Sequence, residues 1–237
     1  MIAGNVPVFE RARQHALQIL HLEHALGLDV ELAFQRYILT AHPGLMPHLA
    51  RIYHSHICVG VAFLVYMYTF TPRRVFARFR RALALDNAIA FVLITAWRCA
   101  PPRLLPATYG FEDVLHRKSA PGAGNAWTNN RFQLTVAAMP SLHFGTSLLL
   151  AVCAARFSPH RAVRWLAVLW PVGMLVTIVA TANHFLADAA VGALIPYVGW
   201  RYGHVLLRLK PVQDWVFGPV RRRMEVLRKE EEEEEEE

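Results

Sequence analysis

Cysteine is scarce in this chain of 237 residues, which contains three. Cys58, Cys99 and Cys153 each lie in or beside an apolar stretch, and their spacing matches no paired motif. A disulfide framework or a cysteine metal site requires regularly spaced pairs. The three thiols are therefore expected to be small core residues. The sequence implies no metal and no cofactor, and activity in the presence of a chelator is expected.

Charged residues are missing from two long stretches. Residues 52–71 contain no Asp, Glu, Lys or Arg, and residues 165–200 contain only Asp188. Apolar runs of this length are candidates for membrane-spanning helices. The distribution therefore argues against a soluble protein, although an overall composition of 54% apolar and 18% charged residues would permit one.

The formal net charge of +7 comes from arginines that fall just outside the apolar stretches. This placement favours a membrane surface as the partner and argues against nucleic acid. The basic segments 72–81 and 156–164 and the basic residues after position 200 are expected on the cytoplasmic side. The expected spans then alternate across the bilayer without conflict: 52–71, 83–97, 140–156, 165–182 and 185–202.

The predicted fold is all-α, a polytopic transmembrane helix bundle of about five spans, and the chain divides into three parts. Residues 1–50 carry amphipathic helices, the second capped by Asp29, that are expected to lie along the interface or pack over the bundle. Residues 51–204 form the transmembrane catalytic domain. Residues 205–237 form a cytoplasmic tail that is basic and then polyglutamate.

A long connection rich in proline and glycine covers residues 98–138. Connections of this length are usually functional or disordered. Residues 127–132 either line a headgroup pocket or are ordinary interface anchors. His54 and His56, at the start of the first span, are interpreted as interfacial, because nothing nearby completes a metal-ligand set.

One short motif, Met-Pro-Ser-Leu-His-Phe-Gly at residues 139–145, stands at the head of an apolar run. Pro140 suits the first position of a helix, where its missing N–H has no cost. Ser141 and His143 would then lie in the first turn, where free backbone N–H groups favour an anion. A histidine at this place can contact a phosphate and still transfer a proton.

A second motif, Thr-Ala-Asn-His-Phe-Leu-Ala-Asp, covers residues 181–188. His184 and Asp188 are four residues apart and would share one face of a helix. Asn183 is a good N-cap residue, so His184 is expected to begin that helix. Arg103 lies upstream in a Pro-Pro-Arg-Leu-Leu-Pro segment.

Together these segments resemble the type 2 phosphatidic acid phosphatase/haloperoxidase superfamily, over roughly residues 98–192. The Pro-Ser-x-His-x-Gly signature is matched at residues 140–145, and the His-x-x-x-Asp signature by His184 and Asp188. More narrowly, the chain resembles the membrane branch that contains the inositol phosphorylceramide synthases. The resemblance implies a membrane enzyme that acts on lipid phosphates.

Two positions depart from the superfamily pattern. Ile178 stands where the last signature usually has an arginine. The first signature, a lysine followed by Arg-Pro, is absent as such, and Arg98 and Arg103 occupy its place. Arg131 is a hypothetical replacement for the missing arginine.

The resemblance also implies a role for each matched residue. His184 attacks phosphorus and forms a phosphohistidine. Asp188 accepts a hydrogen bond from the other ring nitrogen of His184 and fixes its tautomer. His143 protonates the departing lipid oxygen, and water or a lipid alcohol then accepts the phosphoryl group.

The phosphate oxygens need positive charge and N–H donors around them. Arg103 is the first expected ligand, with interfacial snorkelling as its alternative. Structural alternatives also exist for two catalytic residues, since Asp188 could pair with an arginine of another helix and His143 could be a hydrogen-bonded core histidine. The full set of expected phosphate-binding residues is Arg103, Ser141, Leu142, Gly145, Arg98 and Arg131.

The sequence therefore predicts an integral-membrane transferase of lipid phosphoryl or phospho-headgroup units, similar to an inositolphosphotransferase. Its partners are a lipid phosphate substrate, a lipid alcohol or water as acceptor, and the bilayer. The expected topology places the site on the non-cytoplasmic face. The alternatives are a lipid phosphate phosphatase and a non-catalytic membrane homologue.

Overall fold

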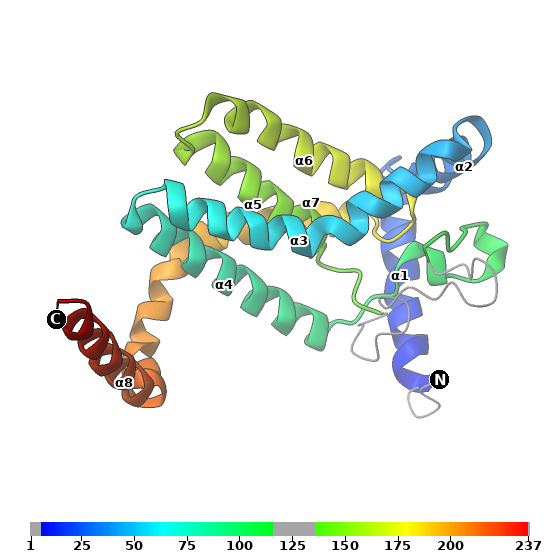
Figure 1. Ribbon diagram of the computed structural model, residues 1–237. Coiled ribbons are helices and arrows are strands. Elements are labelled where there is room, and N and C mark those ends of the chain that lie inside the picture. The colour runs from blue at the N-terminus through cyan, green and yellow to red at the C-terminus, as the bar shows by residue number, and fades with distance from the viewer. Residues whose placement is uncertain (1–5, 116–135, 237) are drawn as a thin grey trace, which may run out of the picture.

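Five helices pack into a bundle in the computed structural model, which describes residues 6–115 and 136–236. Figure 1 shows α3, α4, α5 and α6 running alongside one another, with α7 behind them. Each of the five expected spans coincides with one of these helices. Their bounds are α3 Met46–Phe70, α4 Arg73–Ala96, α5 Leu142–Phe157, α6 Arg161–Ala180 and α7 Leu186–Tyr202.

The remaining helices lie at the two ends of the bundle. Helices α1 and α2 lie at one end, where α7 begins, and α8 leaves the opposite end (Figure 1). The expected cap of α2 is wrong: Val30 is its N-cap, and Asp29 instead accepts a hydrogen bond from Nδ1 of His24 at 2.8 Å. These elements are α1 Val6–Ala25, α2 Glu31–Ala41, α8 Lys210–Glu236 and the 3₁₀ turns η1 Pro43–Leu45, η2 Pro102–Leu104, η3 Ala107–Tyr109 and η4 Gly203–Leu209.

Helix α4 begins at Arg73, well before the expected start at residue 83. The arginine-rich segment is therefore the first part of a helix and not a loop. Asp86, which interrupts the apolar stretch, is buried and accepts a hydrogen bond from the Thr146 hydroxyl at 3.4 Å. A carboxyl group in the apolar part of α4 is tolerated because it faces a polar partner inside the bundle.

Two stretches of the described residues are long and apolar enough to cross a membrane, by length and composition. They are Pro43–Phe70, which includes α3, and α6. Only 6% and 28% of their most apolar windows are buried, whereas the core helix of a soluble protein would be mostly buried. Helix α5 is apolar but shorter. The structure thus supports an all-helical, membrane-associated protein, and the number of five spans stays a prediction.

Helices α5 and α7 meet backbone to backbone. A Cβ atom on Gly145 would collide with the carbonyl oxygen of Gly192, and a Cβ atom on Gly192 would collide with the carbonyl oxygen of Ser141. Pro196 has no N–H to bond the Gly192 carbonyl within α7, so this oxygen is free to lie against α5. Gly145 therefore allows α7 to approach α5 closely.

The glycine contact can be tested with a matched pair of variants. Gly192→Ala should lower the free energy of unfolding by about 1–3 kcal/mol, because the added methyl group overpacks the contact between α5 and α7. Gly173→Ala, inside α6, meets nothing within 4 Å and should be neutral or stabilising by up to about 1 kcal/mol. Thermal unfolding in detergent measures both, and equal melting temperatures for the two variants would contradict the contact.

Candidate active site

The segment before α5 is held in place by two distant parts of the chain. Ala137 forms a parallel bridge with Cys99, and the Ala138 amide donates to the Cys99 carbonyl at 2.9 Å. The Ser141 amide donates to the Asp188 carbonyl at 3.0 Å. These bonds bring the start of α5 against the start of α7. The two sequence motifs, residues 139–145 and 181–188, are thereby brought together.

The start of α5 differs by two residues from the expectation. Pro140 is not its first residue, because Ser141 is the N-cap and its hydroxyl accepts from the Phe144 amide at 3.3 Å. The Gly145 amide donates to the Ser141 carbonyl at 3.0 Å and is not available to a ligand. The amides of Leu142 and His143 have no acceptor within residues 6–115 and 136–236. These two amides can therefore bind an anion.

His184 precedes α7 instead of beginning it. Phe185 is the N-cap residue, so the expected cap at Asn183 is wrong. The His184 ring is buried, and its Nδ1 donates to the Ala138 carbonyl at 2.7 Å, since a carbonyl oxygen can only accept. Nε2 is then the unprotonated nitrogen, and it lies 3.4 Å from Nδ1 of His143.

Asp188 lies close to His184 without the expected hydrogen bond. Its Oδ2 is 3.6 Å from Nδ1 of His184, which is too long for a hydrogen bond, and it accepts from the Phe185 amide at 2.9 Å. The expected orienting role of the carboxylate is thus taken by the Ala138 carbonyl. Asp188 caps α7 and places a negative charge beside the imidazole ring.

Arg103 is held beside the second motif. Its amide donates to the Ala182 carbonyl at 3.0 Å, and its Nε donates to Oδ1 of Asn183 at 2.9 Å. Nη1 forms an ion pair with Asp113 at 2.8 Å, and the side chain is only 6% exposed. These bonds use two of the five guanidinium N–H groups, so three can reach a phosphate.

Arg98, the second expected arginine, does not join this cluster. The Arg98 side chain is exposed, and its carbonyl accepts from Nδ1 of His15 at 2.6 Å. Arg131 lies outside the described residues. Ile178, at the position of the missing arginine, is fully buried in the core, and its carbonyl accepts from the His184 amide at 3.3 Å.

Helix α3 adds two aromatic residues to the site. The Tyr53 ring stacks on the His143 ring with centroids 4.3 Å apart. The centroid of the His56 ring lies 5.0 Å from that of His143. Nδ1 of His56 is buried and has no hydrogen-bond partner among the described residues. The interfacial interpretation of His56 missed this contact. The spacing of three residues places Tyr53 and His56 on one helix face, but it does not show that His143 lies against that face.

The described residues contain no group of three or more His, Cys, Asp or Glu side chains placed to hold a metal ion. The site is instead a row of three imidazole rings, His56, His143 and His184, with an arginine and a carboxylate at its edge. The His143 and His184 ring centroids are 5.5 Å apart.

Two buried glutamates accept hydrogen bonds from amides at the start of α7. Oε1 of Glu31 accepts from the Leu186 amide at 2.8 Å, and Oε1 of Glu23 accepts from the Ala187 amide at 2.7 Å. The N-terminus of α7 is therefore occupied by carboxyl groups, and the described anion site is at α5. Glu23 continues the buried stripe that Ala12, Ala16 and Ile19 form at helical spacing along α1.

Comparison with known proteins identifies the family. A family model described as the PAP2 superfamily matches residues 17–202, and the chain belongs to this superfamily. The match confirms the superfamily resemblance but does not select the inositol phosphorylceramide synthase branch. Members are usually phosphatases and often membrane-associated, so membership suggests phosphatase or phosphotransferase chemistry. No curated protein and no solved structure matches the chain.

The buried glutamates predict a pH-dependent stability. Burial raises the pKa of Glu23 from 4.5 to about 8. The neighbouring carboxyl groups of Glu31 and Asp188 also raise this pKa, whereas the hydrogen bond from the Ala187 amide lowers it. Because the folded protein keeps a proton that the unfolded chain loses, this stability is complete below about pH 4.5 and is lost as the pH rises through 8. Between pH 6 and 9 the wild type should lose about 1 kcal/mol or more, which lowers the melting temperature by about 2–4 °C.

Glu23→Gln imitates the protonated form and should flatten this dependence. Glu10→Gln is the matched control, because Glu10 is exposed on the same helix and pairs only with Arg13 among the described residues. Thermal unfolding at each pH measures all three proteins. Parallel pH profiles for Glu23→Gln and the wild type would contradict the assignment.

Proposed function

We propose that this chain is an integral-membrane enzyme that transfers a phosphoryl or phospho-headgroup unit from a lipid through a phosphohistidine. The observation that carries the proposal is the hydrogen bond from Nδ1 of His184 to the Ala138 carbonyl. It leaves the lone pair of Nε2 on the side of the ring that faces His143, whose Nδ1 is 3.4 Å away. A neutral imidazole with a fixed tautomer is the form that attacks phosphorus.

In the first step, Nε2 of His184 forms a bond to phosphorus, and the bond from phosphorus to the leaving lipid oxygen breaks. His143 donates its proton to that oxygen. Arg103 and the two free amides of the first turn of α5 stabilise the charge on the phosphoryl oxygens. Asp188 stabilises the positive ring of the phosphohistidine from 3.6 Å.

In the second step, the acceptor hydroxyl gives its proton to His143 and attacks phosphorus, and the bond between phosphorus and Nε2 breaks. His184 returns to its starting form and His143 regains its proton. We propose a lipid alcohol as the acceptor, as in an inositolphosphotransferase. The burial of His184, which is 4% exposed, supports an acceptor that arrives from the bilayer rather than from bulk water.

A lipid phosphate phosphatase is the second candidate function. It is favoured by the superfamily, whose members are usually phosphatases. The first step is the same, and water takes the place of the lipid alcohol in the second.

The proposed membrane orientation places the site on the non-cytoplasmic face. The turn between α3 and α4, the turn between α5 and α6 and the end of α7 lie at one end of the bundle, and the starts of α5 and α7 lie at the other (Figure 1). The first end carries the arginines of segments 73–81 and 156–164. Positive charge beside membrane helices favours the cytoplasmic side.

Replacement of the nucleophile should abolish turnover. His184→Ala should lower the rate by at least about a thousandfold, because no phosphohistidine can form. The assay supplies phosphatidic acid alone, or phosphatidylinositol with ceramide, to purified protein in detergent, and mass spectrometry identifies the products. His48→Gln, an exposed residue of α3, is the matched control and should keep wild-type activity.

The products distinguish the two candidate functions. A phosphorylated sphingolipid together with diacylglycerol supports the transferase. Phosphate released from phosphatidic acid supports the phosphatase. Equal turnover by wild type and His184→Ala would exclude His184 as the nucleophile.

His56 is proposed as a positioning residue that acts through the ring of His143. His56→Ala should lower kcat by about tenfold with little change in KM, because His143 loses the ring that packs against it. His56→Phe restores an aromatic ring and should stay within about threefold of the wild type. A kcat unchanged by His56→Ala, measured in the same lipid assay, would contradict this role.

A further inference from the structure

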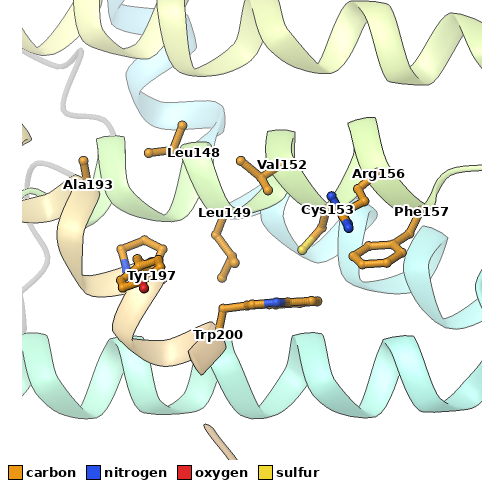
Figure 2. Close-up of a pocket in the computed structure, with 10 residues that line it drawn as sticks. Leu148, Leu149, Val152, Cys153, Arg156, Phe157, Ala193, Tyr197 and Trp200 are labelled. Carbon is orange, nitrogen blue, oxygen red and sulfur yellow. The ribbon is translucent and has the colours of Figure 1, made fainter. Parts of the chain in front are cut away.

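A cavity lined by residues of α5 and α7 lies away from the histidines, and it is called the groove below. Its volume is about 200 Å³, and Figure 2 shows its lining side chains. Pocket sites for whole small molecules are usually larger, roughly 300–1,000 Å³. The size suits a segment of one acyl chain better than a complete compact ligand.

The walls of this groove are almost entirely apolar. Leu148, Leu149 and Val152 extend from α5, Ala193 and Tyr197 come from α7, and the rings of Trp200 and Phe157 lie next to each other at one end (Figure 2). The Trp200 and Phe157 rings are stacked with centroids 5.6 Å apart. A flexible hydrocarbon chain can fill such a surface without leaving a polar group unpaired.

One arginine lines the groove, and a second lies against the Trp200 ring that forms part of its wall. Arg156 is part of its lining and is exposed. The guanidinium of Arg78 lies 4.4 Å from the centre of the Trp200 ring and donates to the Trp200 carbonyl at 3.4 Å. Among the side chains that the structure describes, no carboxylate forms an ion pair with either arginine. The groove therefore has a positive end and an apolar body.

We propose that this groove binds one anionic phospholipid, with an acyl chain along α5 and α7 and the phosphate at Arg156 and Arg78. Basic pockets between membrane helices on the cytoplasmic side are suited to anionic headgroups. Trp200 is at the same end, where an aromatic ring favours the boundary between hydrocarbon and headgroups.

The groove is separate from the catalytic site. His143 lies in the first turn of α5 and Arg156 in its last turn, which places them about 20 Å apart along the helix axis. The bound lipid is therefore a structural or regulatory ligand at the opposite end of the bundle from the reacting phosphate. The proposal does not depend on the proposed chemistry.

Native mass spectrometry of the purified protein in detergent tests the proposal, with phosphatidylglycerol and phosphatidylcholine of the same acyl chains titrated separately. Phosphatidylglycerol should bind at least about fivefold more tightly. Arg156→Gln should remove most of this preference, because the phosphate loses a partner. Ala193→Phe should weaken binding by about tenfold, because the ring fills the groove.

Two control variants keep the test specific to the groove. Arg161→Gln removes an exposed arginine at the start of α6, and Leu194→Phe adds a ring on the exposed side of α7. Both should bind phosphatidylglycerol like the wild type. Arg156→Gln changes an exposed side chain, so it tests the proposal even if Ala193→Phe does not fold.

Three outcomes would overturn the proposal. The first is equal binding of the two lipids by the wild type. The second is a preference for phosphatidylglycerol that survives in both Arg156→Gln and Ala193→Phe, since the anionic lipid would then bind elsewhere. The third is a protein dimer that dissociates in these two variants, which would assign the groove to a second copy of the chain.

Discussion

The starts of α5 and α7 touch backbone to backbone, and the rest of the site depends on that contact. Gly145 and Gly192 lack the side chains that would separate the helices, and the Ser141 amide bonds to the Asp188 carbonyl at 3.0 Å. Two motifs about forty residues apart thereby bring His143 and His184 within 3.4 Å of each other. Precise placement of a nucleophile and an acid accounts for much of the rate that an enzyme can supply.

The starts of α5 and α7 differ in whether their first amides have hydrogen-bond acceptors. At α7, the carboxyl groups of Glu23, Glu31 and Asp188 accept from these amides. The start of α5 keeps the amides of Leu142 and His143 without an acceptor among the described residues. A helix start attracts negative charge in both cases. At α7 the protein's own carboxyl groups accept from the free amides, and at α5 a phosphate can accept from them.

The bundle also has two chemically different ends. The end where α5 and α7 start carries the three histidines, Arg103 and the buried carboxyl groups, while the other end carries the arginines of segments 73–81 and 156–164 and the apolar groove. Arginines favour the headgroup region, and uncharged faces favour hydrocarbon. The same distribution of charge therefore underlies both the proposed orientation in a bilayer and the proposed site for an anionic lipid.

Local patterns in the sequence determined the positions of helices α3 to α7, because uncharged apolar runs and basic flanks are visible residue by residue. They also determined the family, since both signatures are short and contiguous. The tertiary structure alone decided that Ala138 orients His184, that His56 lies beside His143, and that Glu23 and Glu31 cap α7. Each of these contacts joins residues far apart in the chain, and no local spacing encodes which distant groups will meet once the helices pack.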